Sequence, residues 1–210
     1  MKDLIIVGAS GFGRELLQMV KEINASEPEW NVLGFLDDNL AALDGVECSY
    51  GIIGTVQNWQ PKEYEHFAIA IAAPKVKKRI VAELEEKGAV FASLLHPTAK
   101  LADHVSVGRG LIMAADTSLS VNVRIGDFVF MNHYAGIGHD CVVGSYCMIG
   151  PRSSLSGHTT LGEGVTIGAH ACTHPGVTIG EYATLGMNSV AIKKVKPYTT
   201  VFGVPAMKIC

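Results

Sequence analysis

Residues 131–149 read MNHYAGIGHDCVVGSYCMI, with a large apolar residue at every sixth position, as at Met131, Ile137 and Val143. The same register runs from 101 to 185 without an insertion, and fourteen of its fifteen positions hold a large apolar residue. A glycine follows the apolar residue in nine of these repeats. A fixed short period of this kind is typical of a solenoid, whose repeats bury their apolar side only against their neighbours.

Three such repeats make one triangular coil, and parallel strands of successive coils stack about 4.8 Å apart. The large apolar residue points inward. We expect the small residue after it to lie where the backbone turns sharply and passes close to the next coil, which glycine permits. The sequence therefore predicts a parallel β-helix over 95–194, with a tail over 195–210.

Residues 1–94 show a different pattern, in which short apolar runs alternate with amphipathic segments. Strands and helices are expected in the order 4–7, 14–23, 32–36, 67–72, 75–87 and 90–95. This alternation predicts an α/β domain with a small Rossmann-like parallel sheet, joined to the repeats near His96-Pro97.

Composition narrows the functional class. The formal net charge is −3 with a pI near 6.2, so no basic footprint for nucleic acid is present. The longest apolar run is too short to cross a bilayer, so no membrane partner is expected. Five cysteines form no disulfide framework, which favours a reduced, cytoplasmic setting. No Cys/His spacing matches a closed zinc site, so we expect no metal.

Three further motifs accompany the repeats: the unit Gly8-Ala9-Ser10-Gly11-Phe12-Gly13, the pair His139-Asp140, and the segment FGVPAMK at 202–208. Together they resemble the hexapeptide-repeat acyltransferases, in particular the family of sialic acid O-acetyltransferases and nucleotide-amino-sugar N-acetyltransferases. The resemblance covers essentially the whole chain. It implies a left-handed β-helix, a homotrimer with active sites between subunits, acetyl-CoA as cosubstrate, and a sugar or nucleotide-sugar acceptor in surface-glycan synthesis.

The resemblance also implies roles for single residues. His139 would be the general base, Asp140 would orient it, and Asn132 would help to hold the acceptor. Backbone and side-chain positions expected to contact the acetyl group and the CoA arm are Gly157, Ala169, Met187, Val204, Pro205 and Lys208. Positions expected to bind the sugar nucleotide are Gly8, Ser10, Gly11, Phe12, Gly13, Asp37 and Asp38.

The residue types suit acetyl transfer. A histidine has an unperturbed pKa near 6.5, and a neighbouring carboxylate can fix its tautomer. Residues eighteen apart stack in one column, so Gly157 lies above His139, and its missing side chain is expected to leave room for the acyl group. His158 lies above Asp140 in the same way. Asp140 could therefore orient His139, or could instead be tied up by His158.

Two departures from the family concern the nucleotide pocket. Phe12 stands where many members carry His, and Ala72-Ala73-Pro74 replaces a Gly-Asn or Gly-Asp. The glycine spacing also differs from the dinucleotide fingerprint, so NAD is not expected; the unit could simply be a tight turn. Two alternatives to sugar acetylation stay open: an acyltransferase for a non-sugar small molecule, and a non-catalytic β-helix binding protein.

Overall fold

The computed structural model describes residues 1–209 and divides the chain into two compact units, Met1–Pro97 and the residues from Thr98 onward. The expected domain boundary after residue 94 lies three residues before this division. Cys210, the last residue of the expected tail and one of the five cysteines, lies outside the described residues.

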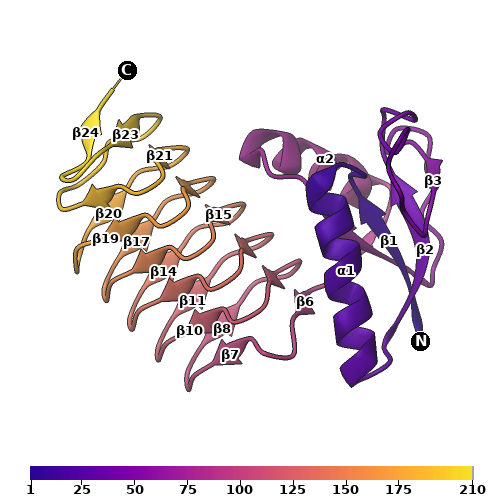
Figure 1. The fold of residues 1–210 in the computed structure, drawn as a ribbon, viewed down its shortest axis with the longest axis horizontal. Helices are drawn as coiled ribbons and strands as arrows, with labels where there is room; N and C mark the ends of the chain where they lie inside the picture. Colours follow the sequence, from indigo (N-terminus) through magenta and orange to yellow (C-terminus); the bar gives the residue numbers. More distant parts are fainter. Residues whose placement is uncertain (210) are drawn as a thin grey trace. The chain divides into compact units, whose positions relative to one another are not determined.

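The first unit is a five-stranded parallel sheet with the strand order β3-β2-β1-β4-β5. Its elements are β1 (Lys2–Val7), α1 (Gly11–Ser26), β2 (Trp30–Leu36), β3 (Ile52–Gly54), β4 (Glu65–Ile69), α2 (Pro74–Glu86) and β5 (Val90–Phe91) (Figure 1). The connections through α1 and α2 run in opposite directions along the sheet. Because parallel crossovers are right-handed, the two helices cover opposite faces of the sheet.

Two details of this unit differ from the sequence prediction. Strand β3 was not expected, because three residues are too few to show a periodic pattern. The strand expected over 90–95 is split into β5 and the separate β6 (Leu94–Leu95). Apolar character alone does not reveal where ladder pairing stops, so one apolar run predicts one strand.

The second unit is a β-helix with three flat walls of parallel strands (Figure 1). The first wall contains β7 (Lys100–Leu101), β10 (Ser118–Leu119), β13 (Gly136–Ile137), β16 (Ser154–Leu155), β19 (Cys172–Thr173) and β22 (Val190–Ala191). The second wall contains β8 (Ser106–Val107), β11 (Arg124–Ile125), β14 (Val142–Val143), β17 (Thr160–Leu161) and β20 (Thr178–Ile179). The third wall contains β9 (Ile112–Met113), β12 (Phe130–Met131), β15 (Met148–Ile149), β18 (Thr166–Ile167), β21 (Thr184–Leu185), β23 (Thr200–Phe202) and the antiparallel β24 (Met207–Lys208).

The ladders pair residues eighteen apart, as in Gly136 with Ser154 and Ile137 with Leu155. Ile137 is 2% exposed and packs in the interior, as the period predicts. Leu101 and Val107 are 42% and 43% exposed, because the first coil of this unit has no earlier coil to cover it. The expected fold class, an α/β sheet followed by a left-handed parallel β-helix, is confirmed.

The corners correct one part of the prediction. The left-handed backbone conformation falls two residues after the repeat glycine, on side chains such as Asn122 (φ 61°) and Asp140 (φ 58°). The repeat glycine serves close approach instead: a Cβ on Gly138 would lie 2.8 Å from the backbone nitrogen of Gly157 in the next coil. Strained φ and close packing are thus assigned to different positions of each repeat.

We name the corners by the walls that they join. The first corner joins the first wall to the second, the second corner joins the second wall to the third, and the third corner joins the third wall to the first. Neither helix among residues 1–209 has the length and apolar character needed to cross a membrane.

Candidate active site

His139 and Asp140 lie at the first corner, directly after β13. Neighbouring side chains in a strand point to opposite faces, so adjacency alone would not bring them together. Asp140 adopts the left-handed conformation (φ 58°), and the turn brings His139 Nδ1 within 2.7 Å of Asp140 Oδ2. The corner therefore forms an imidazole–carboxylate pair from two consecutive residues.

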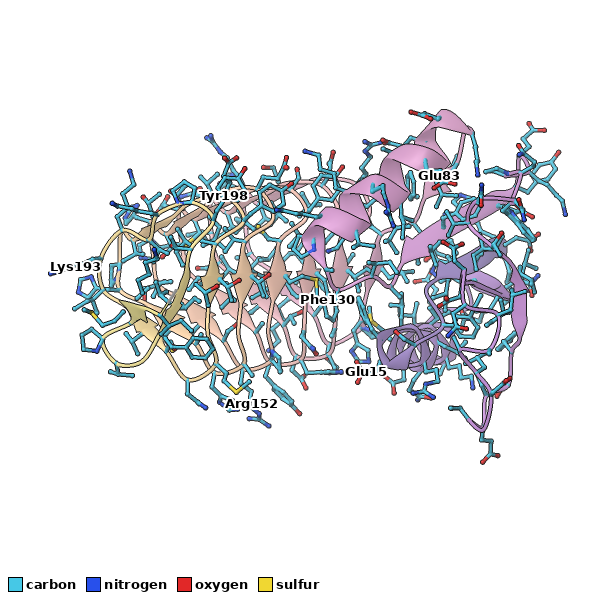
Figure 2. All side chains as sticks on the ribbon, turned by 90° about the horizontal axis from the view of Figure 1, so that it is seen from above. Glu15, Glu83, Phe130, Arg152, Lys193 and Tyr198 are labelled. Atoms are coloured by element: carbon cyan, nitrogen blue, oxygen red, sulfur yellow. The ribbon has the colours of Figure 1, made fainter. Side chains whose placement is uncertain are left out.

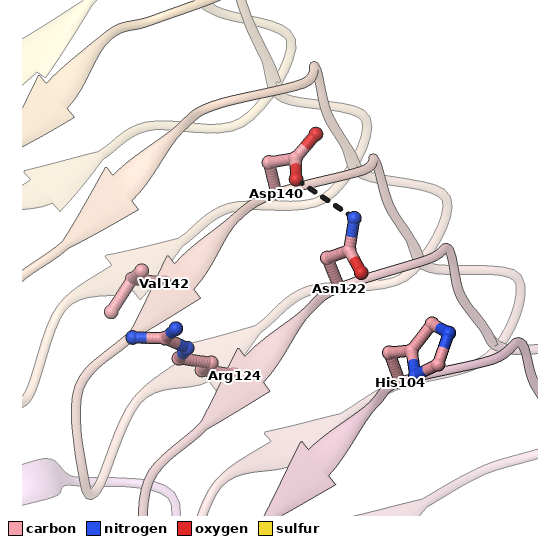
Figure 3. Close-up of a pocket in the computed structure, with 5 residues that line it drawn as sticks. All are labelled: His104, Asn122, Arg124, Asp140 and Val142. Atoms are coloured by element: carbon pink, nitrogen blue, oxygen red, sulfur yellow. Dashed lines mark hydrogen bonds between the residues drawn. The ribbon is translucent and has the colours of Figure 1, made fainter.

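The carboxylate of Asp140 has two other neighbours. The Asn122 side chain, one coil earlier, donates a hydrogen bond to Oδ1 over 3.1 Å (Figure 3). His158 Nε2, one coil later, lies 3.9 Å from Oδ2, a distance for charge attraction but not for a hydrogen bond. Of the two alternatives for Asp140, the geometry favours orientation of His139 over capture by His158.

These contacts set the ionisation of Asp140. The hydrogen bond from His139, followed by the one from Asn122, holds the pKa of the Asp140 carboxyl below its ordinary value. Asp140 is therefore ionised at neutral pH. A carboxylate on Nδ1 favours the tautomer with a proton there, which leaves the Nε2 lone pair free to accept one. The His139 side chain is 53% exposed, so a substrate can reach it.

Gly157 lies against the ring of His139, but not as predicted. A Cβ on Gly157 would lie 2.5 Å from both Cε1 and Nε2 of His139. The space left by the missing side chain is thus occupied by the imidazole itself, not kept open for an acyl group. Glycine at this position lets the ring lie on the next coil while Nδ1 reaches Asp140.

A groove of about 430 Å³ follows this column along the second wall, lined by His104, Asn122, Arg124, Asp140 and Val142 (Figure 3). Arg124 was not singled out from the sequence. It is the outward residue of β11 and places a guanidinium in the groove that contains Asp140. Arg124 lies eighteen residues before Val142, and this register is the sequence signal that places the two side by side on the second wall.

The structure separates the remaining β-helix positions from His139. Asn132, Ala169 and Met187 each follow a strand of the third wall and lie at the third corner. Within one chain, the residues expected to hold the acceptor and the CoA arm are therefore at a different edge of the prism from His139 and Gly157. Val204, Pro205 and Lys208 belong to the tail around β23 and β24.

Cys141 follows the pair directly but is not placed to act as a nucleophile. It is fully buried, and its Sγ lies 3.2 Å from the carbonyl oxygen of Ser156. Burial raises the pKa of the Cys141 thiol, so the thiolate needed for covalent catalysis is disfavoured.

His139, Asp140 and His158 also offer ligand atoms within 4.8 Å of one another, a spacing that a metal ion could use. All three side chains are exposed or partly exposed, and the hydrogen bond between His139 and Asp140 already accounts for the shortest contact.

In the first unit, the glycine-rich segment 8–13 lies directly after β1. A cavity of about 140 Å³ is lined there by Val7, Gly8, Leu36, Asp37, Asp38, Val56, Ile71, Val76, Arg79 and Ile80. Asp37 accepts a hydrogen bond from Ala9 N over 2.8 Å, and Asp38 accepts one from Val56 N over 3.1 Å. Both carboxylates therefore hold loop backbone as well as facing the cavity.

The other residues of the glycine-rich segment are either packed against neighbouring backbone or exposed. Gly8 has a φ of 103°, and a Cβ there would lie 2.8 Å from the carbonyl oxygen of Ala70. Gly13 is buried where α1 crosses the backbone of Gly8. Ser10 and Gly11 are exposed at the start of α1, and Ser10 makes no side-chain cap. Phe12 is half-buried.

With this geometry described, comparison with known proteins defines the class. Residues 3–84 match the PglD N-terminal domain, residues 122–157 the bacterial transferase hexapeptide (six repeats), and residues 158–191 the hexapeptide repeat of succinyl-transferase. The hexapeptide repeats of the β-helix therefore place the chain in the class of hexapeptide-repeat acyltransferases.

Individual relatives narrow the class further. GDP-perosamine N-acetyltransferase of Escherichia coli O157:H7 is 30% identical over 160 residues, which are 73% of this chain and 69% of that protein. The acetyltransferase domain of PglB from Neisseria gonorrhoeae, solved with acetyl coenzyme A, is 26% identical with a TM-score of 0.89 over 99% of both chains. WeeI from Acinetobacter baumannii is 27% identical with a TM-score of 0.87 over the whole of both chains.

This chain belongs to the nucleotide-amino-sugar N-acetyltransferase family, and it is an acetyltransferase. The resemblance found in the sequence is confirmed. Membership of a family of enzymes excludes the alternative of a non-catalytic β-helix binding protein.

Proposed function

We propose that this protein transfers the acetyl group of acetyl-CoA to the amino group of a nucleotide-linked amino sugar for glycan synthesis. The observation that carries the proposal is the 2.7 Å contact between His139 Nδ1 and ionised Asp140, which leaves Nε2 of a half-exposed imidazole to act as base. Membership of a family of sugar N-acetyltransferases supports the substrate class.

The reaction needs one base and no covalent intermediate on the protein. The amine of the sugar attacks the thioester carbonyl, so a C–N bond forms while Nε2 of His139 accepts the proton that the amine loses. Asp140 stabilises the imidazolium through Nδ1. The tetrahedral intermediate then breaks its C–S bond, and the imidazolium returns the proton to the CoA thiolate. The N–H of Gly157, which lies beside the ring, is the proposed hydrogen-bond donor to the oxyanion.

The division of site residues between two corners supports an active site shared by two subunits. Asn132, Ala169 and Met187 can join His139 only if the third corner of one copy faces the first corner of another. A closed ring of identical contacts of this kind is heterologous and cyclic, as in a trimer. The walls also suit self-association, because residues 101–192 contain no lysine.

The cavity at Gly8, Asp37 and Asp38 is the proposed site for the nucleotide of the acceptor. It lies at the carboxyl ends of β1 and β2, beside the point where the strand order reverses between β1 and β4. Open parallel sheets bind ligands at such a point.

A cytoplasmic location is proposed from the cysteines, because none of the four described ones, Cys48, Cys141, Cys147 and Cys172, forms a disulfide.

Thiol release from acetyl-CoA tests the function, measured across nucleotide amino sugars, nucleotide hydroxyl sugars, free amino sugars and non-sugar amines. We expect turnover with at least one nucleotide amino sugar. His139→Ala should lower kcat by about 10²–10⁴-fold, the usual contribution of a general base. Turnover that occurs only with a non-sugar amine would contradict the proposal.

A further inference from the structure

Asp140 belongs to a column of left-handed residues that runs along the first corner. The members lie eighteen residues apart and have nearly equal φ values: 59° at His104, 61° at Asn122, 58° at Asp140 and 59° at His158. Side chains at such positions lie at the outer edge of the coil, as Figure 2 shows for Arg152 and Tyr198 at the other two corners. Each side chain of the column can therefore contact the one in the coil before it or after it.

The two carboxylate oxygens of Asp140 have separate partners. Oδ2 lies 2.7 Å from His139 Nδ1, and Oδ1 accepts a hydrogen bond of 3.1 Å from the Asn122 side chain (Figure 3). An ionised carboxylate only accepts hydrogen bonds, so the amide nitrogen of Asn122 is the group that faces it. With both oxygens held, the plane of the carboxylate is fixed and Oδ2 stays directed at the imidazole.

The carboxylate needs this second contact because little else holds it. The Asp140 side chain is 37% exposed, and the terminal torsion of an aspartate is broad. His158 Nε2 lies 3.9 Å from Oδ2, so a rotated carboxylate has another partner within reach in the coil after it. Asn122 holds the carboxylate from the coil before it, on the opposite side from His158.

We propose that Asn122 is a positioning residue for acetyl transfer, which holds the Asp140 carboxylate toward His139 and away from His158. The inference rests on the proposed function, since it takes His139 to be the base. In this role Asn122 acts through Asp140 and needs no contact with either substrate. Its loss should therefore lower kcat and leave KM nearly unchanged.

Asparagine at this position has another explanation, because Asn adopts the left-handed conformation more readily than most residues. The same column, however, holds histidine at the same φ in two other coils, so the backbone does not require Asn here. A backbone role predicts a loss of stability that does not depend on Asp140. The positioning role predicts a loss of kcat that exists only while Asp140 is present.

The first test compares Asn122→Ala and Asn122→Asp with wild type in thiol-release assays. Asn122→Ala should lower kcat about 5–20-fold, with KM for both substrates within about 2-fold, because a hydrogen bond to a charged group is lost. Asn122→Asp keeps the shape and the tolerance for a left-handed backbone. It places a second carboxylate against Asp140, so kcat should fall at least as far.

His104→Ala is the matched control. His104 is exposed, lies in the same column with nearly the same φ, and is two strand spacings, roughly 10 Å, from Asp140. Alanine therefore imposes the same left-handed backbone cost in both variants, and a thermal melt should show similar losses of stability. His104→Ala should keep kcat within about 2-fold of wild type, since sites this far apart act independently.

A double-mutant cycle with Asp140→Ala separates positioning from every other role. In the Asp140→Ala background, Asn122→Ala should change kcat by less than about 2-fold, because no carboxylate remains for Asn122 to hold. The same fold-loss in both backgrounds would mean that Asn122 acts independently of Asp140, which overturns the inference.

Nitrogen NMR of the His139 imidazole gives a second readout that needs no substrate. Asn122→Ala should lower the fraction of His139 that has its proton on Nδ1, because the carboxylate that fixes this tautomer is held less firmly. His104→Ala should leave that fraction unchanged. If no thioester releases thiol with any acceptor, the proposed function fails, and the tautomer fraction alone then decides whether Asn122 positions the pair. A tautomer fraction equal to that of wild type, or a kcat equal to that of His104→Ala, would overturn the inference.

Discussion

At the first corner, the position of His139 depends on the side chain of Asp140 and on the absence of a side chain at Gly157. Asp140 binds Nδ1, and the bare Cα of Gly157 receives the other edge of the ring. The position of the proposed base therefore depends on Asp140 and Gly157 as well as on His139 itself.

Gly157→Ala tests whether the absence of a side chain at residue 157 positions the His139 ring. The new Cβ would lie 2.5 Å from Nε2, so the ring must rotate away from Asp140 or from the groove. Gly157 is not among the residues with a positive φ, so its backbone accepts alanine. We expect kcat to fall about 10²-fold while the protein stays folded, because only the position of the base changes. Thiol-release kinetics and a thermal melt measure the two quantities, and a kcat near wild type would show that the ring is not confined by this contact.

Asp140→Asn and His158→Asn separate the two partners of the corner. Asp140 has a lowered pKa and is therefore ionised at neutral pH. Asp140→Asn should lower kcat on the order of 10²-fold, because the imidazolium that forms during transfer loses its carboxylate. His158→Asn should leave kcat within about 3-fold, since His158 lies 3.9 Å away and makes no hydrogen bond to Asp140. Equal losses in the two variants would mean that His158 orients Asp140 during catalysis.

At the scale of the elements, the corners differ in how they stabilise a left-handed backbone. The first corner stacks polar side chains, with Asn122 bonded to Asp140. The second corner stacks aromatic rings, with Phe128 and Tyr146 nearly parallel at 5.5 Å between centroids. Gly110 ends that stack, and a Cβ there would lie 2.5 Å from the Phe128 ring.

Gly110→Ala should therefore destabilise the β-helix more than a matched glycine with the same kind of backbone. Gly176 also has a positive φ (75° against 65°), but a Cβ there would have no neighbour within 4 Å. Gly176→Ala should cost only the left-handed backbone term, about 1–2 kcal/mol. Gly110→Ala adds displacement of the ring, typically 1–3 kcal/mol more. Chemical denaturation measures both, and equal losses would show that Phe128 moves aside freely.

The six-residue period was enough to predict walls, coils and the inward residues, because burial of one apolar row leaves a direct trace in the sequence. It did not locate the strained corner residue. Left-handed positions here hold Phe128, Arg152 and His170 as well as Asn and Asp, so composition contains no signal for them. Short strands such as β3 escaped for a related reason, since three residues show no period.

The pair His139-Asp140 was found through family motifs, and the eighteen-residue column correctly placed Gly157 above it. The column could not show that the ring itself fills the space at Gly157, because register gives neighbours but not side-chain rotation. The same register contains Arg124, but a single cation forms no motif, so its place in the groove could not be predicted.

At the scale of the whole molecule, the division of the site between two corners has a consequence for mixed oligomers. His139 and Gly157 lie at the first corner, and Asn132 lies at the third. If one active site uses His139 from one copy and Asn132 from the next, each single variant removes every site of its own oligomer. A mixed ring, however, contains some interfaces at which both residues are intact.

Co-refolding His139→Ala with Asn132→Ala should therefore restore activity that neither variant has alone. In random one-to-one mixtures, about a quarter of the interfaces combine the intact His139 of one copy with the intact Asn132 of its neighbour. Recovered kcat per subunit should approach that fraction of wild type. A mixture of His139→Ala with Asp140→Asn is the control, because both residues come from the same corner of the same copy and no interface regains both. Restored activity in the control, or none in the first mixture, would place Asn132 outside a site shared between copies.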